Sequence, residues 1–269
     1  MENALEFALE SERAGARTVV RRALARSPLR LLTPQNDGHA AWVYTSSFGG
    51  GFVDGDSVEL SIRLGAATKA ALLSQSSTKV YRSPAGASQR IEGRLEEGAT
   101  FFSLPDPVVC FKGSNFSQRQ CYDLEAGASL LLVETVHSGR YSSGERWVFD
   151  SYRSRIEVRR NQKPVFLESL CLDSGAGPLA NRLGRFNAYS LILLLGPELE
   201  ARGRELLEAV SSERLMQGAN LVASGSVLPH EGVVLRLASV STEVLSEAVR
   251  RYLSFVPEML GDNPWARKW

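Results

Sequence analysis

The amino-acid sequence predicts a mainly β fold, with a body of stacked strands that are antiparallel or β-helix-like and two α-helices in the C-terminal third. Short apolar segments separated by Gly, Pro, Asn and Asp run from about residue 18 to residue 172, as is typical of strands and turns. A loose repeat of roughly 30 residues lies within this stretch. Beyond about residue 195 the apolar residues follow a helical spacing instead.

The stretch 57–64 is the clearest predicted strand, because every second residue in it is apolar and alternate side chains share one face of a strand. Shorter segments with the same alternation occur at 147–152, 155–158 and 165–172. No helical segment separates these strands. We therefore expect them to pair mostly antiparallel.

The loose repeat consists of a Gly-Ala pair that follows a leucine strand end and precedes an apolar strand. It occurs at Gly65-Ala66, Gly98-Ala99 and Gly127-Ala128. One interpretation is a stack of coils, each burying the apolar face of its neighbour. The other is chance recurrence of common turn chemistry, because glycine suits many turns.

The C-terminal third predicts two helices with two strands between them. Pro197 to Met216 has amphipathic spacing and begins with a proline suited to a first helical turn. A second helix begins after Ser241 or Thr242, either of which can cap it, and Pro257 limits it. The strands are predicted at 220–223 and 232–238. This gives a β-rich body over about 18–195 and a helix-containing region over about 196–269.

The composition argues against several classes of protein. The formal net charge is +1, so no strong field directs the chain to nucleic acid or to a membrane. The longest apolar run, 189–195, is shorter than the ~20 residues that span a bilayer. The first ten residues lack the cationic start and apolar core of a signal peptide, and the three cysteines form no CxxC pair. We expect a cytoplasmic protein with reduced thiols.

Common catalytic motifs are absent from the sequence. It contains no GxxxxGK[ST], HExxH or GxSxG motif, and no GxGxxG after a strand. The three histidines, His39, His137 and His230, lie far apart in sequence. The glycine-rich run 49–56 lacks a lysine and a following helix, so it predicts a hairpin and not a phosphate loop. We expect no enzyme, no tightly bound cofactor and no closed metal site.

Two carboxylates lie within apolar segments. Glu134 follows four apolar residues, and Glu168 interrupts the strand predicted at 165–172. Each either points to solvent from the alternate face or lies inside, where it needs a polar partner. The residue pattern alone favours the solvent face.

The polar C-terminal segment 261–269 contains two tryptophans, Trp265 and Trp269. A frayed end rarely carries two large aromatic side chains. We expect this tail to dock on the body or on a partner.

Several ordered segments resemble the urease accessory proteins UreD and UreH. That family carries a GGxxxGD stretch followed by a QxxTKxYR segment, which here corresponds to 50–56 and 75–82 and includes the motif residues Gly51, Gly55, Thr78, Tyr81 and Arg82. Three more segments are similar to the family: Leu104 to Pro107 with Phe111, Phe116 to Gln120, and the Gly139-Arg140 turn that leads to Glu145 and Trp147. Five segments in the family order are hard to obtain by chance.

The resemblance implies a single domain over 1–269 that acts as a non-catalytic scaffold for urease maturation. It implies UreF, the GTPase UreG and the urease apoprotein as partners, and assistance in nickel insertion. It also implies an internal polar passage for transient Ni²⁺, onto which Asp56, Lys79, Glu134 and Glu168 map. Such a passage needs scattered carboxylates and water, since a closed cage would retain the ion. Trp265 and Trp269 are the predicted UreF contact.

Two alternatives stay open. One is a carbohydrate-type hydrolase on a β-helix scaffold, with Asp56, Glu134 or Glu168 as acid and base; it needs two carboxylates within about 5–10 Å in an open cleft. The other is a protein-binding module that uses strand edges or the aromatic tail and handles no metal.

Overall fold

The computed structural model describes residues 3–12, 15–229 and 231–266. In chain order the strands are β1 (Asn3–Glu12), β2 (Gly15–Leu24), β3 (Leu29–Leu32), β4 (Ala41–Ser47), β5 (Ser57–Leu64), β6 (Lys69–Ser74), β7 (Thr78–Val80), β8 (Ser83–Leu95), β9 (Thr100–Leu104), β10 (Val108–Cys110), β11 (Ser114–Leu124), β12 (Ser129–His137), β13 (Ser151–Arg160), β14 (Lys163–Asp173), β15 (Ala188–Leu195), β16 (Leu221–Leu228) and β17 (Gly232–Ser239). The helices are α1 (Leu179–Arg182), α2 (Pro197–Ser212), α3 (Thr242–Tyr252) and α4 (Val256–Leu260).

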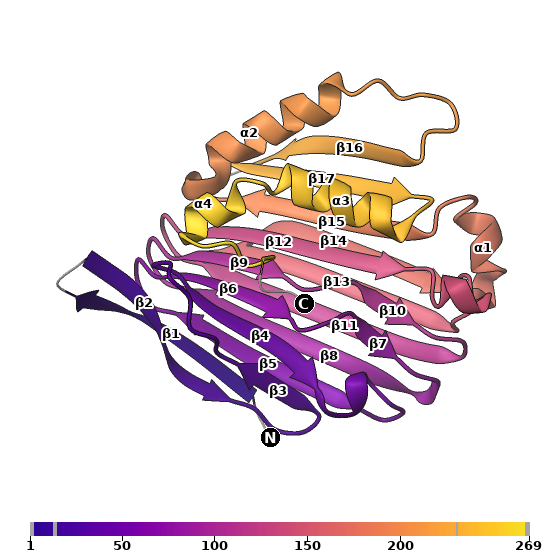
Figure 1. Cartoon of the computed structure of the whole chain (residues 1–269), viewed down its shortest axis with the longest axis horizontal. Helices are drawn as coiled ribbons and strands as arrows, with labels where there is room; N and C mark the ends of the chain where they lie inside the picture. Colours follow the sequence, from indigo (N-terminus) through magenta and orange to yellow (C-terminus); the bar gives the residue numbers. More distant parts are fainter. Residues whose placement is uncertain (1–2, 13–14, 230, 267–269) are drawn as a thin grey trace.

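The strands form two facing sheets (Figure 1). Sheet 1 is seven-stranded, with the order β14-β13-β11-β8-β5-β1-β2. Sheet 2 is ten-stranded and follows the path β16-β17-β15-β12-β9-β6-β4-β3, with β7 and β10 beside it. In the central coils the chain passes from one sheet to the other and back, so each of these coils of the resulting solenoid contributes strands to both sheets.

The expectation of mostly antiparallel pairing is wrong for the central coils. The neighbours β5, β8, β11 and β13 are parallel in sheet 1, as are β4, β6, β9 and β12 in sheet 2. In a solenoid the next strand along the chain belongs to the other sheet, and the pairing partner comes one full coil later. Antiparallel pairs occur toward the ends, as in β1–β2, β3–β4, β13–β14 and β15–β17.

The loose repeat marks real stacked coils. Leu64, Leu95 and Leu124 lie in one ladder at the ends of β5, β8 and β11. The turns after them stack too, and Gly98 and Gly127 both adopt left-handed conformations, with φ of 68° and 67°. In the first coil this position is Ala67, with φ of 55°. Gly65 therefore lies two residues before the turn position that the other two glycines occupy.

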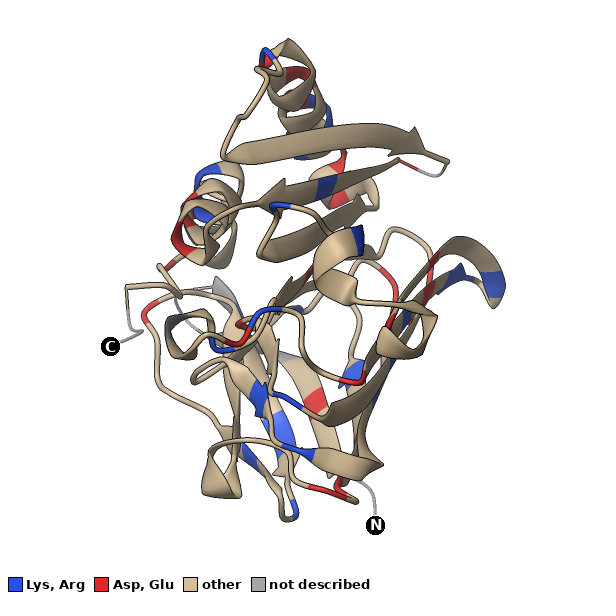
Figure 2. Cartoon of the chain, turned by 90° about the vertical axis from the view of Figure 1, so that its right-hand side faces the viewer, with Lys and Arg blue, Asp and Glu red and all other residues tan. Residues whose placement is uncertain are grey.

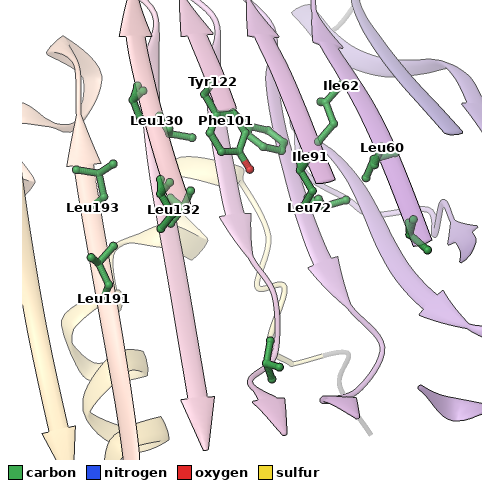
Figure 3. Packing of buried hydrophobic residues seen from close by; sticks show 14 of the residues in the cluster. Leu60, Ile62, Leu72, Ile91, Phe101, Tyr122, Leu130, Leu132, Leu191 and Leu193 are labelled. Atoms are coloured by element: carbon green, nitrogen blue, oxygen red, sulfur yellow. The ribbon is translucent and has the colours of Figure 1, made fainter. Parts of the chain in front are cut away.

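The main core lies between the two sheets. Inward residues of adjacent strands meet there in layers, as Figure 3 shows for Leu60, Ile91, Phe101 and Leu132. Phe101 and Tyr122 face each other across this space, with ring centroids 6.0 Å apart. Because successive side chains point to opposite faces of a strand, each strand contributes every second residue to this core.

A second core lies on the other face of sheet 2, beneath the C-terminal helices (Figure 1). The predicted helices are present as α2 and α3; α2 ends four residues before the predicted Met216, and Ser241 caps α3 by accepting a bond from the Val244 amide. The short helices α1 and α4 were not predicted. None of the helices in the described residues is long and apolar enough to cross a membrane.

Candidate functional site

A polar cluster interrupts the apolar core at Glu134. Leu130 and Leu132 of β12 point between the sheets, and Glu134, two residues further on, shares their face. Its side chain is 7% exposed. The solvent-facing alternative therefore does not hold for this residue.

All of the hydrogen bonds found at this carboxylate end on Oε2. Gln118 Nε2 donates at 2.6 Å, Gln120 Nε2 at 3.1 Å and the Ser154 hydroxyl at 2.7 Å. The donors belong to β11 and β13 of sheet 1, so the cluster joins the two sheets. Among the described residues none donates a hydrogen bond to Oε1. One carboxylate oxygen thus accepts three hydrogen bonds, and the Tyr152 hydroxyl lies next to the same carboxylate.

Burial raises the pKa of Glu134, and the hydrogen bonds from Ser154, Gln118 and Gln120 oppose that rise. The cluster extends to Tyr122, whose hydroxyl donates to Gln120 Oε1 at 3.0 Å. The Tyr152 hydroxyl is also buried and lies next to Glu134 and Ser154, although within the described part of the chain it makes no hydrogen bond of ordinary geometry. Its pKa is raised by burial and by the charge of Glu134.

Glu168 faces the same space between the sheets and is bound by an arginine. Arg236 of β17 donates to Glu168 Oε2 and forms an ion pair with it. The Glu168 side chain is 20% exposed. Tyr189 of β15 lies nearby, and burial, followed by the Glu168 charge, raises its pKa to about 12. Both predicted glutamates therefore face the space between the sheets, and the charge of each raises the pKa of Tyr189.

Asp56 and Lys79 lie elsewhere. Asp56 is half-buried in the turn before β5, where its Oδ2 accepts a bond from the Val53 amide at 2.8 Å. Lys79 is half-buried on β7, and its carbonyl accepts from the Phe52 amide at 2.8 Å. Within the described residues no hydrogen bond or ion pair joins either residue to the glutamates. The structure thus places two of the four predicted passage residues, Glu134 and Glu168, between the sheets.

The family-like motifs occupy turns that stack on one edge of the solenoid. Gly51 lets the next coil approach, since a Cβ there would lie 2.4 Å from the Lys79 carbonyl oxygen and 2.9 Å from the Tyr81 ring. Tyr81 packs edge-on against Phe111, with centroids 5.2 Å apart. Arg140 lies 4.5 Å over Phe111. These residues form a ladder across successive coils and have a packing role.

The other motif residues also serve this edge. Gly55 has a left-handed φ of 81°. The Thr78 amide donates to the Pro107 carbonyl at 2.9 Å, which links two adjacent coils. Arg82 lies against Gly113, and a Cβ at that glycine would be 3.4 Å from Arg82 Cγ.

The described part of the C-terminal tail docks on the body. Trp265 packs against the second core. The Tyr44 hydroxyl donates to the Pro264 carbonyl at 3.0 Å, and Asp262 Oδ2 accepts from the Asp37 amide at 3.2 Å. Trp269 lies outside the described residues. Trp265 is thus held by its own chain, and its predicted partner contact stays a prediction.

Sequence reasoning missed Gln118, Gln120, Ser154 and Tyr152. A signal was present, because Phe116, Gln118, Gln120, Tyr122 and Leu124 share one face of β11. Side-chain amides on the same strand face as buried apolar residues indicate a buried polar site. Within the described residues no three His, Cys, Asp or Glu side chains are grouped so as to hold a metal ion.

The chain matches a known family over residues 3–269, and that family is described as UreD urease accessory protein. The chain belongs to the UreD family. A protein named urease accessory protein UreD from Sorangium cellulosum is 45% identical over 257 residues, which cover 96% of this chain and 82% of that protein. Its counterpart from Anaeromyxobacter is 41% identical, covering 94% and 85%. Urease accessory protein D of Oryza sativa subsp. indica is 30% identical, covering 96% and 94%. The resemblance drawn from the motifs is confirmed.

Proposed function

We propose that this chain is a non-catalytic urease maturation factor in the cytoplasm that bridges UreF and the GTPase UreG to the urease apoprotein and assists nickel insertion. Family membership supports the link to urease. The observation that carries the nickel role is the buried Glu134 carboxylate, which is held between the sheets by Gln118, Gln120 and Ser154. No tightly bound cofactor, nucleic acid or membrane is part of the proposal.

The cluster has the chemistry of a transit site. Ni²⁺ accepts oxygen ligands, and a single carboxylate with amide and hydroxyl neighbours binds it more weakly than a closed cage does. Burial raises the pKa of Glu134, so binding of a cation to its carboxylate competes with a proton. A cation that arrives releases the proton, and a proton that returns helps to release the cation.

Glu168 supplies the second interior carboxylate of the proposed passage. Its oxygen is bound by Arg236, so a cation that reaches it competes with the guanidinium group. That competition keeps binding weak, as a conduit requires. In this proposal Asp56 and Lys79 lie at the surface end, on the motif edge, and Trp265 and Trp269 remain the UreF contact.

The proposal is tested by co-expression of UreF, UreG and apo-urease with and without this chain. We expect urease to contain nickel and hydrolyse urea only when the chain is present, and the chain to co-purify with UreF and urease. Equal nickel content and activity without the chain would refute the maturation role.

The two alternatives gain no specific support. A hydrolase needs a second carboxylate near Glu134 in an open cleft, but the side chains that bond to Glu134 are two amides and a hydroxyl. A module that handles no metal would give urease with full nickel when Glu134 is replaced and the complex stays intact.

A further inference from the structure

Positive charge is concentrated at one end of the solenoid, where β2 ends sheet 1 and β3 ends sheet 2 (Figure 1). Residues 17–30, which run from β2 into β3, include five arginines and no aspartate or glutamate. The whole chain has 31 Lys and Arg against 30 Asp and Glu, and the two signs are mixed over the molecule in Figure 2. The excess at this end is therefore a local feature that the net charge of the chain does not reveal.

The carboxylates of the chain itself neutralise this charge only in part. Arg22 forms an ion pair with Glu6 on the neighbouring strand β1, at 3.4 Å. Arg21 on β2 and Arg30 on β3 are exposed and, within the described residues, form no ion pair with a carboxylate. A guanidinium group carries five N–H donors in a fixed plane. Those of Arg21 and Arg30 are thus available to an acidic ligand.

An exposed aromatic ring lies against the same segment. The Phe48 amide donates to the Pro28 carbonyl at 2.9 Å, just after β4, and Phe48 is 54% exposed. Arg30 Cζ lies 5.0 Å from the centre of the Phe48 ring, so a cation–π contact holds the guanidinium group in place. Arginine and aromatic side chains are common among the residues that contribute most to protein–protein binding.

The combination favours a protein over the other possible ligands. Single-stranded nucleic acid binds to a series of aromatic rings that stack on its bases, but Arg30 lies over one face of the Phe48 ring. A second copy of this chain would bring the same arginines together, and like charges repel. A polypeptide with carboxylates can neutralise the arginines and can also contact the ring and the outer strand β3, which pairs only with β4 among the described residues.

We propose that this end of the solenoid, formed by β2, residues 25–28, β3 and Phe48, docks a protein surface that presents carboxylates. Arg21 and Arg30 donate to those carboxylates, each able to form two parallel N–H···O bonds. Arg30 is already oriented by the Phe48 ring, so it loses less freedom on binding. This inference rests on the proposed function for the choice of the partner proteins in its test.

The test compares variants of this chain that are co-expressed with UreF, UreG and apo-urease and purified through a tag on this chain. Arg30→Glu should reduce the recovery of one partner at least about ten-fold, because repulsion replaces an ion pair. Phe48→Ala should reduce the recovery of the same partner. The matched controls are Arg204→Glu on α2, where the Arg204 side chain is 66% exposed, and Tyr141→Ala, where Tyr141 is 62% exposed; both should retain all partners. Circular dichroism checks that the variants are folded.

The outcomes separate this inference from the proposed function. Recovery of all three partners by both Arg30→Glu and Phe48→Ala would overturn the docking proposal and leave the proposed function intact. An equal loss with Arg204→Glu would show a general charge effect and would also overturn it. A parent chain that recovers none of the three partners would refute the proposed function, and this inference with it.

A second measurement tests phosphate ligands on the same surface. The parent chain and the same variants are mixed with a labelled oligothymidylate, followed by fluorescence anisotropy, or with phosphatidylserine vesicles, followed by co-sedimentation. We expect no binding that depends on Arg30. Binding that Arg30→Glu abolishes, while all three partners are still recovered, would assign these arginines to phosphates and overturn the proposal.

Discussion

Replacement of Glu134 by alanine should be one of the most destabilising single substitutions in the chain. Gln118, Gln120 and Ser154 would lose their common acceptor in a buried space. A buried donor without a partner costs about 1–3 kcal/mol, and the lost side chain adds a cavity. Three donors that relax in part give an expected loss of about 3–5 kcal/mol. Glu134→Gln keeps an acceptor oxygen and the shape, and should cost about 1 kcal/mol.

Urea unfolding followed by tryptophan fluorescence measures these losses, with the exposed Glu59→Ala as the control. The pH dependence gives a second check. Burial raises the pKa of Glu134 in the folded chain, so the wild type loses stability as pH rises above the unfolded value of about 4.3. Glu134→Gln removes that loss, and its Tm relative to wild type should rise between about pH 4 and pH 7. A loss below about 1 kcal/mol for Glu134→Ala would refute the assignment of three buried, dependent donors.

Three further predictions concern packing and titration. Gly51→Ala should lower the free energy of unfolding by about 2 kcal/mol or more, because the new Cβ would lie 2.4 Å from the Lys79 carbonyl oxygen. Gly175→Ala is the control and should lower it less, because the nearest atom to its Cβ is 3.1 Å away. Urea unfolding measures both losses. Burial lowers the pKa of His137 to about 4, so the stability of the folded chain should fall as pH drops from about 6.5 toward 4. In calorimetry, His137→Gln should make Tm depend less on pH over this range. An unchanged pH dependence would contradict the burial of His137. Truncation after Leu260 should lower Tm by several degrees through loss of Trp265 and the Tyr44–Pro264 bond; an unchanged Tm would show that the tail contributes nothing to stability.

Local patterns predicted the elements well, and the pairing of the strands less well. The alternation in 57–64 is a strand, and α2 and α3 begin where Pro197 and Ser241 predict. The alternation of apolar and polar residues predicts which side chains of a strand face the core, but it does not predict which other strand pairs with it. The spacing of the repeat equals one coil, and strands one coil apart pair in parallel. The prediction of antiparallel pairing instead assumed that strands consecutive in the chain pair with each other.

The site was predictable only in part. Family resemblance pointed to Glu134 and Glu168, and both carboxylates face the space between the sheets. Their partners come from strands far away in sequence: Ser154 lies on another coil and Arg236 on β17. No pattern in a single segment identifies such partners, because the contacts depend on how the two sheets face each other. Asp56 lies in a turn and Lys79 on the short strand β7, and the sequence around them does not show whether their side chains face inward or outward.

The most direct test of nickel transfer through the interior is the nickel content of urease matured with the Glu134→Gln chain. Urease would be purified after co-expression with UreF, UreG and either the wild-type, the Glu134→Gln or the control Glu59→Gln chain, and nickel per subunit measured by mass spectrometry. We expect a clear loss of nickel with Glu134→Gln, with the accessory complex intact by co-purification, and full loading with Glu59→Gln. Full loading with Glu134→Gln would contradict a passage through this carboxylate.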